Sequence, residues 1–459
     1  MGEGSTGADE SGSTQAAAES SSGSTSGSTD GSSGGSVGTT GTTAADGSTT
    51  ATEPSCGDGN TDAGEDCDDA NDVDGDGCNR DCRESGTLLW VETLPNVPGT
   101  DTNTLNAVVV LEGGTIVAGG SRFVGKEGAF QSEANLVRFS PDGAPELNVD
   151  LVTTERDDSV RGLDVDAMGR IYVVGDQDAI NNVQSSGWVA QVDADGVPIG
   201  DIVVSSTGER SGFRAVTTSP GVVTVAGFQG DGSGVSTHAL TYSPLLALAG
   251  TDDSVGSDPV QTQSYLRDVV TDEHGTYVAG YGRDGATLRG FTTTSPLTSV
   301  AHVPPDPVNN TYLAGVAIAD PGNEDSVLWS VGWNDGEDFP LLAQLYRVSR
   351  DGQLEDSRPS YLGAESQGAF YSSIIVDPSG DLIVAGGSLI GDLPNQFVPL
   401  VRRLDASGDE LWTRVFNARD SVRGGVSELS VDADGSIVVC GFAADIAGER
   451  RQMVAKLRP

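Results

Sequence analysis

The sequence contains few basic residues. Its 459 residues include 25 Lys and Arg against 68 Asp and Glu, which gives a formal net charge of −43. A field of this sign repels nucleic acids and anionic membrane surfaces, because both bind proteins through Lys and Arg. No apolar run approaches the roughly 18 residues that a membrane-spanning helix needs. The sequence therefore excludes nucleic-acid binding and predicts no transmembrane segment.

The usual catalytic signatures are also absent. There are 3 His residues, at unrelated positions, and neither a G-x-S-x-G nucleophile turn nor a phosphate-binding loop is present. Acidic residues occur in nearly every predicted loop, so they single out no carboxylate pair. We predict no catalytic residue, and the missing signatures favour a protein that is not an enzyme.

Residues 1–55 lack Lys, Arg, Leu, Ile and aromatic residues, and 37 of these 55 residues are Ser, Thr or Gly. Such a segment cannot bury enough apolar surface to offset its backbone entropy, which predicts a disordered, low-complexity linker. A secretion signal would need a basic start and an apolar stretch, and neither occurs. We expect that any export signal or lipid anchor is not present in this chain.

Four of the 5 cysteines lie within residues 56–84: Cys56, Cys67, Cys78 and Cys82. This segment has almost no apolar residues, so two disulfides must replace a core, and three pairings are open. Zinc is the alternative, but the spacing does not match a zinc motif. The fifth, Cys440, lies in an apolar run and is expected to be a buried free thiol.

The pattern CGDG…GEDCDD.N…GDGC…C over residues 56–84 resembles the myxobacterial cysteine-rich disulfide repeat. That family occurs in predicted surface proteins and lipoproteins. The resemblance implies a lipoprotein-like protein that is extracellular or located at the cell surface.

The same segment holds Asp72, Asp74 and Asp76 in a DxDxDG pattern. Carboxylates at alternate positions before a Gly turn suit Ca²⁺, which makes calcium a candidate cofactor. The twelfth loop position is Arg83 where an EF-hand needs Glu, although Asp68 or Asp69 could substitute. The alternative is a solvated acidic turn.

Residues 86–459 form an internal repeat. A β-branched run that ends in Gly recurs at Gly119, Gly175, Gly227, Gly280, Gly332, Gly386 and Gly441, with gaps of 52 to 56 residues. Each repeat has four short predicted strands and tight Asp-x-x-Gly or Ser-x-x-Gly turns. Four-stranded units repeated around an axis predict an all-β, seven-bladed β-propeller.

The two ends of the repeat region complement each other. Residues 86–94 align with the fourth strand at 408–416, whereas 453–457 align with a third strand that lacks a fourth. We therefore predict that the N- and C-terminal strands pair and close the ring, which leaves no exposed sheet edge at the junction. The repeat pattern resembles bacterial propeller repeats of the delta-60 type, a resemblance that implies a fold without an activity.

One repeat position is unusually basic. Five residues before each first hairpin turn stand Asn106, Arg161, Arg214, Arg267, Gly315, Ser372 and Ser427. Three register-matched arginines at the channel predict a site for a carboxylate or phosphate. The alternatives are a set of structural ion pairs with acids such as Asp164 or Asp268, or a solvated channel.

A second repeat position, directly after the glycine, is aromatic in four repeats: Phe228, Tyr281, Trp333 and Phe442. These rings either stack on a sugar or wedge between blades. The predicted variable loops at roughly 121–132, 176–187, 228–236, 281–288, 333–340, 387–397 and 442–451 lie on the same face.

Together these features predict a non-catalytic, monomeric, exported or cell-surface protein whose propeller binds a protein or carbohydrate ligand. The predicted ligand-binding residues are Arg161, Arg214, Arg267, Tyr281 and Trp333. The alternatives are a secreted propeller hydrolase or lyase acting on an anionic polysaccharide, and a calcium-dependent adhesion module.

Overall fold

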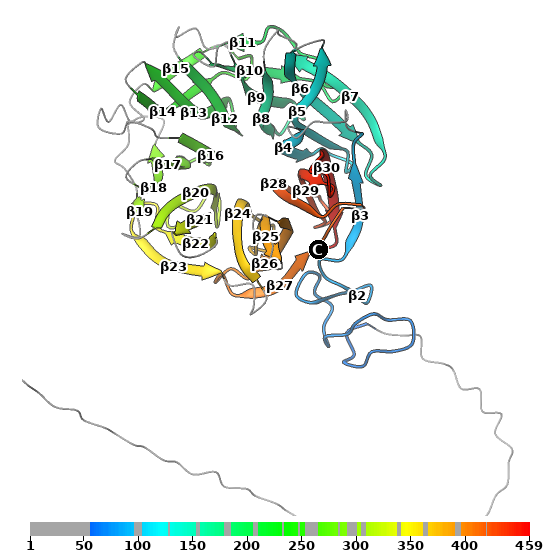
Figure 1. Ribbon diagram of the computed structural model, residues 1–459. Helices are drawn as coiled ribbons and strands as arrows, with labels where there is room; N and C mark the ends of the chain where they lie inside the picture. Colours follow the sequence, from blue (N-terminus) through cyan, green and yellow to red (C-terminus); the bar gives the residue numbers. More distant parts are fainter. Residues whose placement is uncertain are drawn as a thin grey trace, which may run out of the picture. The chain divides into compact units, whose positions relative to one another are not determined.

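The computed structural model describes residues 56–95, 103–126, 129–152, 157–178, 185–204, 210–231, 234–246, 248–252, 265–282, 285–291, 301–303, 309–336, 341–360, 366–390, 396–418 and 420–459 (Figure 1). The predicted linker at 1–55 lies outside these residues. Glu53–Pro459 form one compact unit, which contains both the cysteine-rich segment and the repeats. The described residues contain no helix long and apolar enough to span a membrane.

The described strands of the repeat region form seven four-stranded antiparallel sheets, here called blades 1 to 7. Blades 1 to 3 consist of β4 (Thr104–Val110), β5 (Ile116–Lys126), β6 (Ala129–Phe139) and β7 (Pro145–Val152); β8 (Asp158–Val165), β9 (Ile171–Asp178), β10 (Ser185–Val192) and β11 (Val203–Val204); and β12 (Arg210–Ser219), β13 (Val222–Asp231), β14 (Gly234–Tyr242) and β15 (Leu248–Asp252).

Blades 4 to 6 consist of β16 (Tyr265–Thr271), β17 (Thr276–Gly282), β18 (Gly285–Phe291) and β19 (Ala301–Val303); β20 (Asn309–Ile318), β21 (Leu328–Gly336), β22 (Leu342–Val348) and β23 (Leu354–Ser360); and β24 (Ser366–Val376), β25 (Leu382–Ile390), β26 (Phe397–Leu404) and β27 (Glu410–Val415). Blade 7 combines β28 (Arg423–Val431), β29 (Ile437–Ala444) and β30 (Arg450–Leu457) with β3 (Leu88–Thr93).

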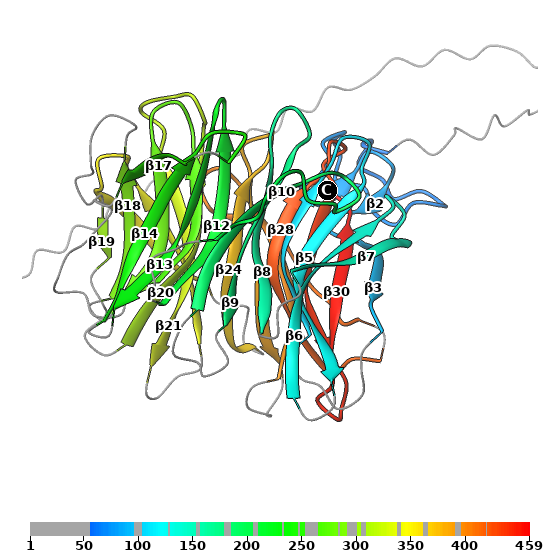
Figure 2. The same cartoon turned by 90° about the horizontal axis from the view of Figure 1, so that it is seen from above.

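In Figure 1 the first strand of each blade lies nearest the centre and the fourth lies at the periphery, and Figure 2 shows the strands from the side. This arrangement confirms the all-β propeller fold that the repeats predict. In blade 7 the N-terminal strand β3 pairs antiparallel with the C-terminal strand β30, with Val91 opposite Ala455. The pairing between the chain's two ends is the one inferred from the alignment of residues 86–94.

The predicted tight turns have the expected geometry. In the turn Asp166–Gly169, the Asp166 carboxylate accepts hydrogen bonds from the backbone N–H of Met168 (2.9 Å) and Arg170 (3.0 Å). Gly169 has a φ of 76°, a conformation that only glycine adopts without strain. The turn residues therefore fix the register of the hairpins that they connect.

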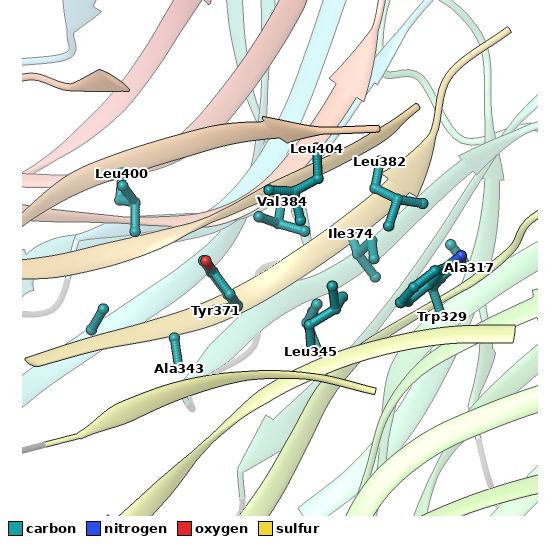
Figure 3. Packing of buried hydrophobic residues seen from close by; sticks show 12 residues of the cluster. Ala317, Trp329, Ala343, Leu345, Tyr371, Ile374, Leu382, Val384, Leu400 and Leu404 are labelled. Atoms are coloured by element: carbon teal, nitrogen blue, oxygen red, sulfur yellow. The ribbon is translucent and has the colours of Figure 1, made fainter. Parts of the chain in front are cut away.

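Apolar side chains fill the space between neighbouring blades. Figure 3 shows the cluster between blades 5 and 6, in which Trp329 of β21 and Leu345 of β22 pack with Tyr371 and Ile374 of β24. All four of these side chains are at most 3% exposed. Because each blade buries both faces in this way, its strands can be almost continuously apolar.

Each innermost strand carries a β-bulge at the same place. The bulged residue has no partner on the second strand, and the seven bulged residues are Asn106, Arg161, Arg214, Arg267, Ala314, Ser372 and Ser427. A bulge re-aims a side chain and is common near functional sites. The sequence count predicted Gly315 in blade 5, which is wrong by one residue. Ala319 bonds to Val327 as Asp166 bonds to Arg170 in blade 2, so the turn is longer and begins one residue before Asp320.

Three of the predicted variable loops, at 121–132, 228–236 and 281–288, are largely strand. β5 and β6 stay paired from Ile116 and Phe139 as far as Lys126 and Ala129, and β13 and β14 pair as far as Asp231 and Gly234. The prediction of long loops at 121–132 and 228–236 is therefore wrong, because the hydrogen-bonded ladder continues beyond the regularly spaced glycines. The tips at 127–128 and 232–233 lie outside the described residues.

Candidate functional site

A cavity of about 540 Å³ lies between the innermost strands of the blades. All seven of these strands contribute lining residues, and every one of the seven bulged residues is among them. The bulge thus directs one side chain of each blade into the same cavity. The three arginines that the sequence singled out, Arg161, Arg214 and Arg267, meet in this cavity and are here called the arginine arc.

Each arginine of the arc lies against the residue that follows the regularly spaced glycine of its own blade, which is Gly175, Gly227 or Gly280. Arg214 lies over the ring of Phe228 and Arg267 over the ring of Tyr281, each with 5.3 Å between the guanidinium carbon and the ring centroid. Arg267 also donates a hydrogen bond to the Tyr281 hydroxyl (2.9 Å). These cation–π contacts hold the guanidinium groups in place without neutralising them.

In blade 2 the same position is occupied by Asp176. Arg161 Nε lies 2.7 Å from one carboxylate oxygen of Asp176, and Arg214 Nη2 lies 3.1 Å from the other. Burial raises the pKa of Asp176, but the charges of Arg161 and Arg214 outweigh it and leave that pKa below its usual value. One carboxylate is therefore shared by two arginines of neighbouring blades.

The three guanidinium groups are close enough to repel one another. Burial lowers the pKa of Arg214 to about 10; Asp176 opposes that shift, while Arg161 and Arg267 add to it. Arg267 is exposed and forms no ion pair with a described residue. The arc thus carries two positive charges more than its single carboxylate balances, which favours an anion at this place.

Asp164 and Asp268, which were the predicted ion-pair partners of the arginines, do not pair with them. The carboxylates of Asp164 and Asp268 accept backbone N–H groups of neighbouring blades, from Thr218 (2.6 Å) and Val316 (2.8 Å) respectively. The ion-pair partner is Asp176, which the sequence reasoning missed. The signal was available, because Asp176 follows Gly175 at the repeat position where four other blades carry an aromatic residue.

The aromatic residues fall into two groups. Phe228 is 1% exposed and does not line the cavity, and its ring packs against Gly212 and Arg214 of its own blade. Trp333 and Phe442, together with Phe370 of β24, line the cavity. Trp333 stacks on Tyr312 (5.3 Å between centroids) and meets Phe370 edge-on (6.0 Å), so neighbouring rings hold it in a fixed orientation.

Tyr281 does not line the cavity. It contacts Arg267 through its ring and its hydroxyl group. Its ring also meets Tyr312 edge-on at 4.9 Å. The cavity therefore has arginines on blades 2 to 4 and aromatic side chains on blades 5 to 7. A cationic side facing an apolar, planar side suits a ligand with an anionic group attached to a ring.

The predicted metal residues lie in the cysteine-rich segment, away from this cavity. Asp74 pairs with Arg80 (2.8 Å) and Asp76 accepts a hydrogen bond from the Asn71 amide (3.1 Å). Among the described residues, no group of three or more His, Cys, Asp or Glu side chains is arranged to hold a metal ion. Calcium binding by Asp72, Asp74 and Asp76 stays a prediction.

The cysteine-rich segment contains one of the two expected disulfides, Cys67–Cys78, and a short hairpin of β1 (Cys78–Asn79) and β2 (Arg83–Glu84). Cys56 and Cys82 are free thiols, as is the buried Cys440. Burial and contacts with Cys56 and Glu65 raise the pKa of Cys82 to about 12. The two remaining thiols of the segment therefore lie together, and their pairing stays a prediction.

This segment packs against blade 6. The indole N–H of Trp412 on β27 donates to the Gly75 carbonyl (3.0 Å), and Arg414 pairs with Glu84 (2.9 Å). Gly86 N–H donates to the Pro459 carbonyl (3.1 Å). The segment is thus attached both to blade 6 and to the C-terminal end of blade 7.

No protein-family model matches the chain, and no curated protein matches it. Among solved structures, it is similar to a fungal alcohol oxidase of the AA5 family in complex with copper, with 15% identity over 82% of this chain and 77% of that chain and a TM-score of 0.50. It is also similar to virginiamycin B lyase from Staphylococcus aureus with quinupristin (11% identity, 81% and 99% covered, TM-score 0.46).

A Hadza microbial sialidase is a third similar structure, with 11% identity over 82% of this chain and 69% of that chain and a TM-score of 0.44. At these identities the similarity concerns the propeller fold alone, and function must be argued from the site.

Proposed function

We propose that this protein is a non-catalytic, exported or cell-surface binding protein whose propeller captures an anionic ligand in the central cavity. The observation that carries the proposal is the arginine arc, in which three arginines from three blades line one cavity with a single shared carboxylate. Arg267 is the primary anchor for the anion, because its side chain is exposed, lies over the Tyr281 ring and forms no ion pair with a described residue.

The opposite side of the cavity favours a carbohydrate that bears an acid group. Trp333, Phe370 and Phe442 offer aromatic surface, which packs well against the apolar face of a sugar ring. A uronate or sialic acid combines such a face with a carboxylate. A carboxylate on a partner protein would use the arginines in the same way. The export of the protein is supported by its disulfide and by the resemblance of residues 56–84 to surface proteins.

Isothermal titration calorimetry with glucuronate and sialyllactose tests this proposal, with glucose and lactose as neutral controls. We expect the acidic sugars to bind and the neutral ones to bind at least tenfold more weakly, since each bidentate charge-assisted contact contributes about 1.5–3 kcal/mol. Arg267→Met should abolish binding.

Arg347→Met is the matched control, because Arg347 pairs with Glu355 outside the cavity (3.1 Å). Equal binding by the Arg267 variant and the parent would contradict the proposed site.

A secreted hydrolase or lyase that acts on an anionic polysaccharide is the second candidate. It is favoured by one observation: the carboxyl-bearing residues Asp164, Asp268 and Glu428 line the same cavity as the arginines. Incubating the protein with polyuronate and sialylated substrates and measuring released reducing ends distinguishes the two. Turnover that disappears in Arg267→Met would favour the enzyme.

A further inference from the structure

The cavity contains a second set of ionisable groups besides the arginine arc. Asp164 of β8, Asp268 of β16 and Glu428 of β28 line it, and they are here called the acid trio. Each reaches a different blade interface. Asp164 and Asp268 accept backbone N–H groups from the next blade, and Glu428 accepts a hydrogen bond from the Ser373 hydroxyl of blade 6.

The acid trio has no cationic partner among the described residues, unlike Asp176. Burial raises the pKa of Asp164 and of Asp268 to about 6, and that of Glu428 to about 8. The trio is also mutually repulsive, because Asp164 raises the pKa of Asp268, which in turn raises that of Glu428.

The groups that face the trio add little compensating charge. Cys440 stands opposite Glu428 on β29, and burial raises the pKa of its thiol, so the thiol stays neutral. Tyr172 stands opposite Asp164 on β9 with a pKa raised by burial to about 12, and Asp166 adds a further negative charge near Asp164. Apart from the arginine arc in the same cavity, these described groups around the trio are therefore neutral or negative.

The charge of the cavity consequently depends on pH. The arginine arc contributes three positive charges and Asp176 one negative charge, which leaves a balance of plus two when the trio is protonated. Ionising all three trio members changes this balance to minus one. Protonation of the trio thus converts a cavity with net negative charge into one that attracts anions.

We propose that anion capture by the arginine arc is proton-linked: the acid trio shares the cavity, so the protein binds its anion in acid and releases it as the trio ionises. This inference rests on the proposed function and adds its regulation. The sign follows from linkage, because a bound anion stabilises the protonated carboxyls and its binding must take up protons.

Sulfate and glucuronate are suitable probes, because neither changes its own charge between pH 5.5 and pH 9. Calorimetry of the whole protein with each probe across this range should show the affinity falling by about tenfold or more as pH rises, with proton uptake on binding detected from the buffer dependence of the heat. Binding that is sensitive to Arg267→Met but has the same affinity at pH 5.5 and pH 9 overturns the proton linkage alone. No binding at any pH overturns the proposed function.

Glu428→Gln separates the trio from other titrating groups. Both hydrogen bonds to Glu428, from Ser373 Oγ and from the Leu429 N–H (3.3 Å), end on the same oxygen, which a glutamine retains. The fold should therefore persist, which circular dichroism checks. Asp268→Asn is less suitable, because Val269 and Val316 use both of the carboxylate oxygens.

In Glu428→Gln we expect the loss of affinity between pH 7 and pH 9 to shrink by about threefold to tenfold, the effect of one unit charge at a partly buried site. Glu92→Gln is the matched control, since Glu92 is an exposed residue on β3 of the same blade. A Glu428 variant with the same pH profile as the parent and the control would overturn the inference.

Discussion

Replacing Asp176 with asparagine tests the electrostatics of the arginine arc. The substitution keeps the shape of the side chain but removes the charge that Arg161 and Arg214 share at 2.7 and 3.1 Å. The amide oxygen can still accept one hydrogen bond, whereas the amide nitrogen meets a guanidinium group as a second donor. At least one charge-assisted contact is lost, and each contributes about 1.5–3 kcal/mol.

The burial of Arg214 and its repulsion by Arg161 and Arg267 add to this loss. These effects lower the pKa of Arg214 to about 10 even with Asp176 present, so the native site already disfavours the charge that the Asp176 carboxylate balances. We expect Asp176→Asn to lower the free energy of unfolding by about 3 kcal/mol. Urea unfolding followed by tryptophan fluorescence measures the change.

An added anion should reverse this loss. If sulfate or glucuronate occupies the place that the carboxylate charge has left, it stabilises the variant by about 2.7 kcal/mol at 100 times its dissociation constant. The variant should therefore regain stability on addition of glucuronate and gain less from glucose. A variant as stable as the parent, or one that glucuronate does not stabilise, would refute the account of the arc.

Three other predictions concern features outside the arc. Burial raises the pKa of Asp272, but the hydrogen-bonded Arg350 at 2.5 Å outweighs burial, and the pKa falls to about 2. This ion pair therefore stabilises the fold above about pH 4, and its contribution is lost as pH falls towards 2. In urea titrations, Asp272→Asn should lower the free energy of unfolding by about 2 kcal/mol at pH 7 and by little near pH 2. Aerobically purified protein, unfolded and titrated with a thiol reagent, should expose one thiol if Cys56 and Cys82 pair, whereas three would contradict a second bridge. Thermal melts with calcium or EDTA should differ if the acidic turn of the cysteine-rich segment binds Ca²⁺, and coincident melts would remove calcium from consideration.

The repeat pattern predicted the fold because its signals are local. A turn such as Asp166–Gly169 needs an acceptor side chain and a positive φ, and both requirements are visible in four residues. The same regularity places Arg161, Arg214 and Arg267 at one repeat position, which the spacing of the turns alone reveals. The offset failed only in blade 5, where the hairpin turn is longer and begins at Ala319.

The rest of the site could not be predicted from the sequence, because a bulge interrupts the alternation of faces. After the bulged residue, the side chains of an innermost strand change the face to which they point, so alternation alone does not place Asp268 or Glu428 in the cavity. Asp176 was hidden for another reason. It is an acid among 68, and its role arises from an arginine of the next blade.

The attachment of the cysteine-rich segment has a mechanical consequence. A force applied to the chain at Cys56 reaches the propeller through contacts with Trp412 and Arg414 of blade 6 as well as through β3 of blade 7. The load is divided between two blades, so peeling β3 away from β30 also requires breaking the contacts to blade 6. Such a junction resists pulling better than a single terminal strand does.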